Sequence, residues 1–164
     1  MELVKKAEAA LAGVYKGAPK LSNNTKETLV KIWPWLALIF GIIQLFAALT
    51  LWRLTSRVNE LVSYYGVVTN TNVGYSGMDK FFIYTAIIIL LIDAVILLMA
   101  YPKLAKRQKS GWDLLFLGSL LNVGYSIVNL PISGRGFGDF ILSLLGSAIG
   151  FYLLYQVKEK YSKT

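Results

Sequence analysis

Three polar side chains, each inside a different long apolar run, are the residues of this chain best placed to do chemistry: Asp93, Gln44 and Asn122. At 1.5 Å per helical residue, Asp93 lies about 12 Å, Gln44 about 18 Å and Asn122 about 15 Å from one end of its run, the end that the charge distribution assigns to the cytoplasmic side. Similar heights predict one polar layer. In such a layer, a carboxyl and two carboxamides can hydrogen-bond between neighbouring helices.

Asp93 is the most unusual of the three, because an ionisable group deep in a bilayer is costly and generally has a partner or a task. No basic residue occurs at that depth in any apolar run, so a salt bridge within one chain is not expected. Apolar surroundings favour the neutral carboxyl, which can bond to Asn122 or Gln44. Two interpretations stay open. Asp93 either locks the helices of a bundle or an oligomer together, or takes up a proton or a cation in function.

Several kinds of chemistry are excluded by residue types that the chain lacks. It has no Cys and no His, which removes disulfides, Fe–S clusters and the commonest ligands of zinc and haem. It has no Walker-type phosphate loop, no H-E-x-x-H motif and no G-x-S-x-G elbow. The glycine-rich segment 134–138 lacks a preceding strand and is interpreted as a tight turn. We therefore expect no catalytic residues, no metal, no cofactor and no enzyme activity.

The elements that must position the polar layer are apolar helices. The 164 residues are 55% hydrophobic and only 16% charged, which is typical of membrane proteins. About 20 apolar residues cross a bilayer core, and four segments approach that length: about 32–52, 81–101, 112–130 and 139–157. The sequence thus predicts an all-α membrane protein, with a four-helix transmembrane bundle over 32–157. Helical spacing of apolar residues from 54 to 65 predicts that the first helix continues outward or bends onto the outer surface.

The distribution of charge predicts the orientation of this bundle. Thirteen of the 17 basic residues fall in 1–31, 103–109 and 158–163, which lie on one side of a four-span arrangement. Positive charge marks the cytoplasmic side. We therefore expect both termini, including the basic tail 158–164, in the cytoplasm, and the chain in the plasma or inner membrane. The net charge of +8 then serves lipid head groups rather than nucleic acid.

The N-terminal segment 1–31 is expected to begin with an amphipathic helix at the cytoplasmic surface. Its apolar residues share one stripe, while the lysines, including Lys5 and Lys6, lie off it and Lys16 follows. Packing of this helix under the bundle is the alternative. Trp33 and Trp35 then fall where the inner head-group belt is expected.

Polar residues near the predicted helix starts are interpreted as caps. Asn24 with Glu27 three residues later resembles a capping box. Asp79 and Asp139 each precede an inward-running span, and Asp113 stands near the start of the third. An Asp at a helix start can accept orphan backbone N–H groups and complement the helix dipole.

Small residues predict close contacts between helices. Gly41 and Gly118 lie near the faces of Gln44 and Asn122, and Gly146 with Gly150 forms a small-xxx-small pattern in the fourth span. Such residues let helix backbones approach closely. The helix that packs on Gly146 and Gly150 can belong to this chain or to another copy.

An internal repeat is a further interpretation of the same segments. Trp35 precedes Gly41 by six residues, and Trp112 precedes Gly118 by the same interval. Both pairs open a span from the cytoplasmic side, so the chain would be two tandem helical hairpins. Short apolar helices also share letters by chance, and that alternative stays open.

Three function classes follow from these features. The first is a non-enzymatic accessory or scaffold subunit that binds another membrane protein or itself. The second is a small oligomeric transporter or ion- or proton-conducting protein that uses Asp93 as its coupling carboxylate. A lipid-modifying enzyme is disfavoured, because Asp79, Asp113 and Asp139 fall at opposite membrane faces and cannot converge.

Overall fold

The computed structural model of the chain describes residues 2–69, 77–129 and 137–161. This part of the chain is helical and contains no strands, which confirms the predicted all-α class. The elements are α1 (Glu2–Tyr15), α2 (Asn23–Thr69), α3 (Gly77–Ala105), α4 (Lys109–Asn129), α5 (Phe137–Val157) and the 3-10 turn η1 (Lys158–Lys160).

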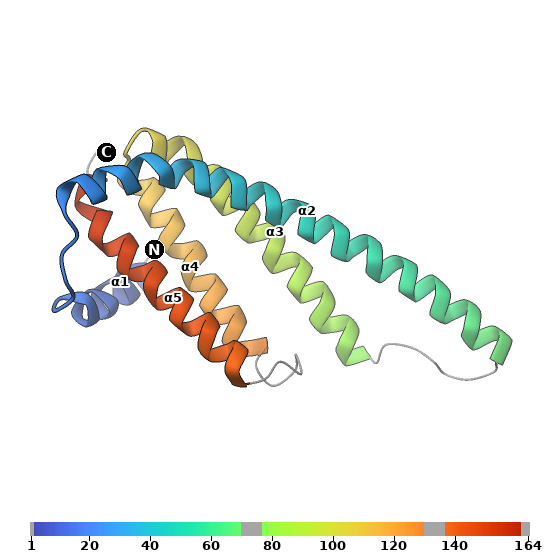
Figure 1. The fold of residues 1–164 in the computed structure, drawn as a ribbon. Helices are drawn as coiled ribbons and strands as arrows, with labels where there is room; N and C mark the ends of the chain where they lie inside the picture. The colour runs from blue at the N-terminus through green and yellow to red at the C-terminus, as the bar shows by residue number, and fades with distance from the viewer. Residues whose placement is uncertain (1, 70–76, 130–136, 162–164) are drawn as a thin grey trace.

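Helices α2 to α5 alternate in direction along the chain (Figure 1). The start of α2, the α3–α4 turn and the end of α5 therefore gather at one end of the molecule, which we call the closed end. Here α1 packs beside α5 (Figure 1). The main contacts join α2 to α3 and α3 to α4. Away from the closed end, α2 and α3 diverge from α4 and α5 (Figure 1).

Two stretches in the described part are long and apolar enough to cross a membrane, Asn23–Val68 and Lys80–Ala105. They contain the first two predicted spans. At 1.5 Å per residue, the 47 residues of α2 extend about 70 Å, more than twice a bilayer core of about 30 Å. The helix therefore continues past residue 52 without a break, which is one of the two outcomes that the apolar spacing predicted.

The start of α2 differs from the predicted capping box. The backbone N–H of Thr25 donates to Ser22 Oγ at 3.2 Å, and α2 begins one residue after Ser22. Ser22 is therefore the capping residue, and the capping box of Asn24 and Glu27 was wrong. The Glu27 carboxylate instead accepts from Arg107 in the α3–α4 turn, at 2.7 Å.

The predicted cap at Asp113 was also wrong. Helix α4 begins four residues earlier, at Lys109, whose ammonium donates to the Asp113 carboxylate at 2.8 Å. The turn before it is tight, because a Cβ on Gly111 would lie 2.7 Å from the backbone nitrogen of Leu104. Arg107 in this turn has φ 56°, a left-handed conformation uncommon for a residue with a side chain.

Some predictions lie outside the described residues. These are the side chains of Asp79 and Asp139 and most of the glycine-rich turn 134–138.

The core is concentrated at the closed end and is rich in aromatic rings. Trp112 and Phe116 of α4 are fully buried and stack with centroids 5.3 Å apart. Phe151 and Tyr155 of α5 meet the Phe116 ring edge to face. Trp112 Nε1 also donates to the backbone oxygen of Leu154 at 2.8 Å. This cluster fixes α4 against α5.

Candidate functional site

The structure brings Gln44, Asp93 and Asn122 together from α2, α3 and α4. Asp93 is 2% exposed. Its Oδ2 accepts from Gln44 Nε2 and from Asn122 Nδ2, each at 2.7 Å. Asn122 Nδ2 also donates to the backbone oxygen of Gly118 at 3.0 Å. One carboxyl oxygen therefore joins three helices.

Two glycines make room for this arrangement. A Cβ on Gly118 would lie 2.8 Å from Asp93 Oδ1, and a Cβ on Gly41 would lie 3.1 Å from Leu98 Cγ. The first contact is closer than real Cβ atoms tolerate, so the absence of a side chain at 118 lets the carboxyl sit against α4. At Gly41, the missing side chain lets α2 approach α3 one turn before Gln44.

The carboxyl group is only partly satisfied. Asp93 Oδ1 and Gln44 Oε1 are buried acceptors without a hydrogen-bond partner in the described part of the chain. Buried polar atoms of this kind are uncommon in folded proteins. A proton on the carboxyl group, or a small cation, would give these two oxygens a partner.

Gly146 and Gly150, the two glycines of the fourth span predicted to pack against a helix, are not covered by a described neighbouring helix as Gly41 and Gly118 are. A Cβ on Gly146 or on Gly150 would meet nothing within 4 Å. No helix in the described part of the chain covers this face of α5. It is therefore open to a helix of another chain or to lipid.

The N-terminal helix packs on protein through its apolar face, which favours packing under the bundle over a position on the membrane surface. Leu11 and Tyr15 contact the core at the closed end. Tyr15 Oη donates to the backbone oxygen of Ala148 at 2.8 Å, and Tyr155 Oη donates to the backbone oxygen of Glu8. Helix α1 is therefore joined to α5 by hydrogen bonds at its middle and at its C-terminal end.

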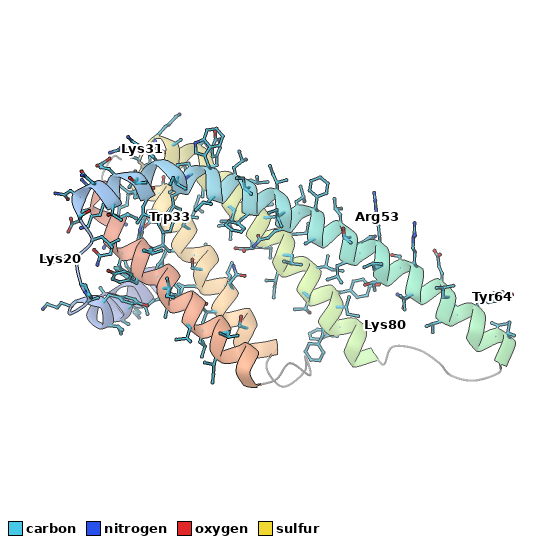
Figure 2. The ribbon with its side chains drawn as sticks, in the orientation of Figure 1. Lys20, Lys31, Trp33, Arg53, Tyr64 and Lys80 are labelled. Carbon is cyan, nitrogen blue, oxygen red and sulfur yellow. The ribbon has the colours of Figure 1, made fainter. Side chains whose placement is uncertain are left out.

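The residues predicted at the membrane surface lie in unlike surroundings. Lys6 and Lys16 are exposed, whereas the side chain of Lys5 is not among those described. Trp35 is exposed, but Trp33 is half-buried against the core on the α4–α5 side of α2 (Figure 2).

A network of ion pairs at the closed end was missed by reasoning from the sequence. Glu27 of α2 pairs with Arg107 at 2.7 Å and with Lys160 at 3.0 Å. Hydrogen bonds from Lys160 and then Arg107 lower the pKa of Glu27. Tyr161 lies buried beside the network, and burial raises its pKa to about 12. These residues are far apart in sequence, so no local pattern connects them. The only signal of ion pairs in the sequence was a few acidic residues among many lysines.

No metal centre is formed by the described residues, since no three Asp or Glu side chains come together there. Comparisons with protein-family models, curated proteins and solved structures give no match for this chain.

Proposed function

We propose that this chain is a multi-pass integral membrane protein that acts as a non-enzymatic accessory or scaffold subunit. It binds another membrane protein or a second copy of itself. Helices α2 to α5 each cross the bilayer of the plasma or inner membrane. The closed end, with both termini, faces the cytoplasm.

The observation that carries this proposal is the position of Asp93. Its Oδ2 is held by amides from two other helices at 2.7 Å each. A carboxyl fixed in this way sets the register of α2, α3 and α4. A buried polar group whose hydrogen bonds hold helices together favours a rigid protein that binds a partner over a protein that catalyses a reaction.

The lengths and exposed apolar surfaces of α4 and α5 support these helices as the third and fourth spans. Helices α4 and α5 have 21 residues each, about 31 Å at 1.5 Å per residue. This matches a bilayer core of about 30 Å. Large apolar side chains of α5 are exposed, among them Leu142, Leu145 and Ile149. Hydrocarbon is a favourable surrounding for such a surface.

The open face at Gly146 and Gly150 is the surface best suited to a partner helix. Small residues four apart allow close backbone approach, and dispersion contacts then hold helices together in lipid. No described helix of this chain occupies the face.

The test is extraction of the tagged chain from its native membrane in a mild detergent, with mass spectrometry of everything recovered at equal stoichiometry. We expect one partner or a defined homo-oligomer. The double substitution Gly146→Leu and Gly150→Leu should remove it. Gly124→Leu is the matched control, since a Cβ there also meets nothing within 4 Å. Recovery of a monomer alone would contradict the proposal.

A transporter is the second candidate, favoured by the unpartnered Asp93 Oδ1 and Gln44 Oε1. Two free buried acceptors can receive a proton or a cation. The substitution Asp93→Asn separates the two functions, because the amide oxygen still accepts hydrogen bonds but cannot be ionised. An accessory protein keeps its fold and partner, whereas a transporter in vesicles loses proton or cation flux while it stays folded. Asp93→Leu should loosen the helices in either case.

A further inference from the structure

A hollow of about 260 Å³ lies at the closed end, between α1, the segment 16–22, the start of α2 and the end of α5. Its lining includes three lysines, Lys16, Lys20 and Lys26, and one acid, Glu159. The hollow is therefore strongly basic. Its volume is below the range of about 300–1,000 Å³ typical for drug-sized ligands, and suits a single small anionic group.

The segment that carries Lys20 is fixed to α5. Tyr152 Oη donates to the backbone oxygen of Pro19 at 2.6 Å, and Gln156 Nε2 donates to the same oxygen at 3.1 Å. The backbone N–H of Leu21 donates to Gln156 Oε1 at 3.1 Å. Lys20 lies between these two anchored residues, at the edge of the molecule beside α1 (Figure 2). Its backbone position is thus set by α5.

The three ammonium groups are weakly neutralised. Neither Lys16 nor Lys20 forms an ion pair with any residue in the described part of the chain. The side chain of Lys26 is only 11% exposed, and the carboxylate of Glu159 is 3.9 Å away. A largely buried cation with so distant a partner favours the approach of an anion.

An apolar stripe on α5 leads away from the hollow. Gln156 and Tyr152 share a helix face with Ile149, Leu145 and Leu142, since these residues are spaced by three and four. The last three are 60%, 55% and 69% exposed. The stripe lies about a quarter to a third of a turn from the Gly146 and Gly150 face, so lipid and a partner helix can use α5 together.

We propose that this hollow binds the phosphate of an anionic phospholipid, with the acyl chains along the α5 stripe. The lysines supply the charge, and the adjoining apolar stripe favours a lipid over a free phosphate. Because α1, α2 and α5 all line the hollow, the bound lipid would hold the N-terminal segment against the last helix. This inference rests on the proposed position of the closed end at the cytoplasmic membrane surface.

The experiment uses the full chain in an uncharged detergent, with native mass spectrometry during titration with phosphatidylglycerol or with phosphatidylcholine of equal chain length. We expect one phosphatidylglycerol to bind in preference. A lysine near a membrane surface contributes about 1 kcal/mol, so Lys16→Gln with Lys20→Gln should weaken binding about 30-fold. Lys26→Met, which keeps the aliphatic stem, should weaken it about fivefold on the same scale.

The matched control is Lys31→Gln with Lys106→Gln, which removes the same charge from two exposed lysines outside the hollow. Its binding should stay within about twofold at physiological ionic strength, because neither lysine lines the hollow and salt screens exposed charges. Equal losses in both double variants would overturn the site in favour of general attraction. Equal affinity for inorganic phosphate and for phosphatidylglycerol would overturn the lipid assignment. Helix content by circular dichroism shows that each variant is folded.

Failure of this inference can be told apart from failure of the proposed function. A chain that needs detergent for solubility and co-purifies with a partner, yet binds both lipids alike, rejects the lipid site alone. A chain that stays in solution without detergent rejects the membrane proposal on which the site depends.

Discussion

Gly118→Ala tests whether the Asp93 carboxyl holds three helices together. The new methyl would lie 2.8 Å from Asp93 Oδ1, so the carboxyl must move away from α4. Both hydrogen bonds to Oδ2 would then lengthen or break. Interhelical hydrogen bonds in a membrane contribute about 0.6 to 1.7 kcal/mol each, so the loss of two costs about 1–3 kcal/mol.

Gly124→Ala is the control for this substitution, because it lies in the same helix and a Cβ there meets nothing within 4 Å. Alanine gains up to about 1 kcal/mol over glycine in a helix, and this gain is common to both variants. Their difference therefore reports the clash with the carboxyl.

The assay is thermal unfolding in detergent, followed by far-UV circular dichroism. A domain of this size shifts its midpoint by about 2–4 °C per kcal/mol, so Gly118→Ala should unfold about 2–12 °C below Gly124→Ala. Equal midpoints for the two variants would refute the reasoning, because the carboxyl would then be free to move at no cost.

Three further substitutions test the closed end, each by thermal unfolding in detergent. Trp112→Phe removes the hydrogen bond to the Leu154 carbonyl and should lower the unfolding free energy by about 1–3 kcal/mol; an unchanged midpoint would contradict this. Glu27 has a lowered pKa, so its carboxylate stabilises the fold above its ordinary pKa of 4.5 and loses that effect as pH falls below it. Glu27→Gln should therefore flatten the acid dependence of the midpoint, and an identical pH profile would argue against the ion pairs. Tyr161→Phe removes a buried hydroxyl that has no partner among the described residues, so stability should stay equal or rise, and a marked loss would reveal a missing partner.

The helices were predictable from the sequence because apolar length is a local property. The runs at 32–52 and 81–101 lie within α2 and α3. Helical spacing beyond residue 52 predicted that the first helix either continues or bends, and α2 continues to Thr69. Away from the closed end, α2 and α3 diverge from α4 and α5 (Figure 1), and the sequence did not predict this divergence. How helices splay depends on contacts between residues distant in sequence, which periodicity does not report.

Depth along a helix explains what was predictable about the candidate site. Counting residues placed Asp93, Gln44 and Asn122 at similar heights, and their side chains do meet. The same counting could not show that Gly118 admits the carboxyl, or that Gly146 and Gly150 stay uncovered, because height says nothing about the direction in which a residue faces.

Caps and ion pairs were the least predictable features. Several residues near each helix start could serve as a cap, and the choice depends on tertiary partners. The spacing of Glu27 from Asn24 predicts a capping box, but the Glu27 carboxylate forms ion pairs with both Arg107 and Lys160 instead. These partners come from the α3–α4 turn and the C-terminal segment, which no local pattern connects to α2.

Labelling of introduced cysteines from the two sides of the membrane tests the central claim most directly. The chain has no Cys, so single substitutions can be probed in sealed vesicles with a membrane-impermeant thiol reagent. Gly17→Cys, Gly77→Cys and Gly138→Cys suit the purpose, since a Cβ at each of these positions meets nothing within 4 Å. Lys106→Cys marks the α3–α4 turn.

Four spans with cytoplasmic termini predict that the reagent reaches positions 77 and 138 from the outer side only, and positions 17 and 106 from the cytoplasmic side only. If position 138 is labelled from the same side as position 106, α4 and α5 do not cross the bilayer. The four-span account would then be wrong.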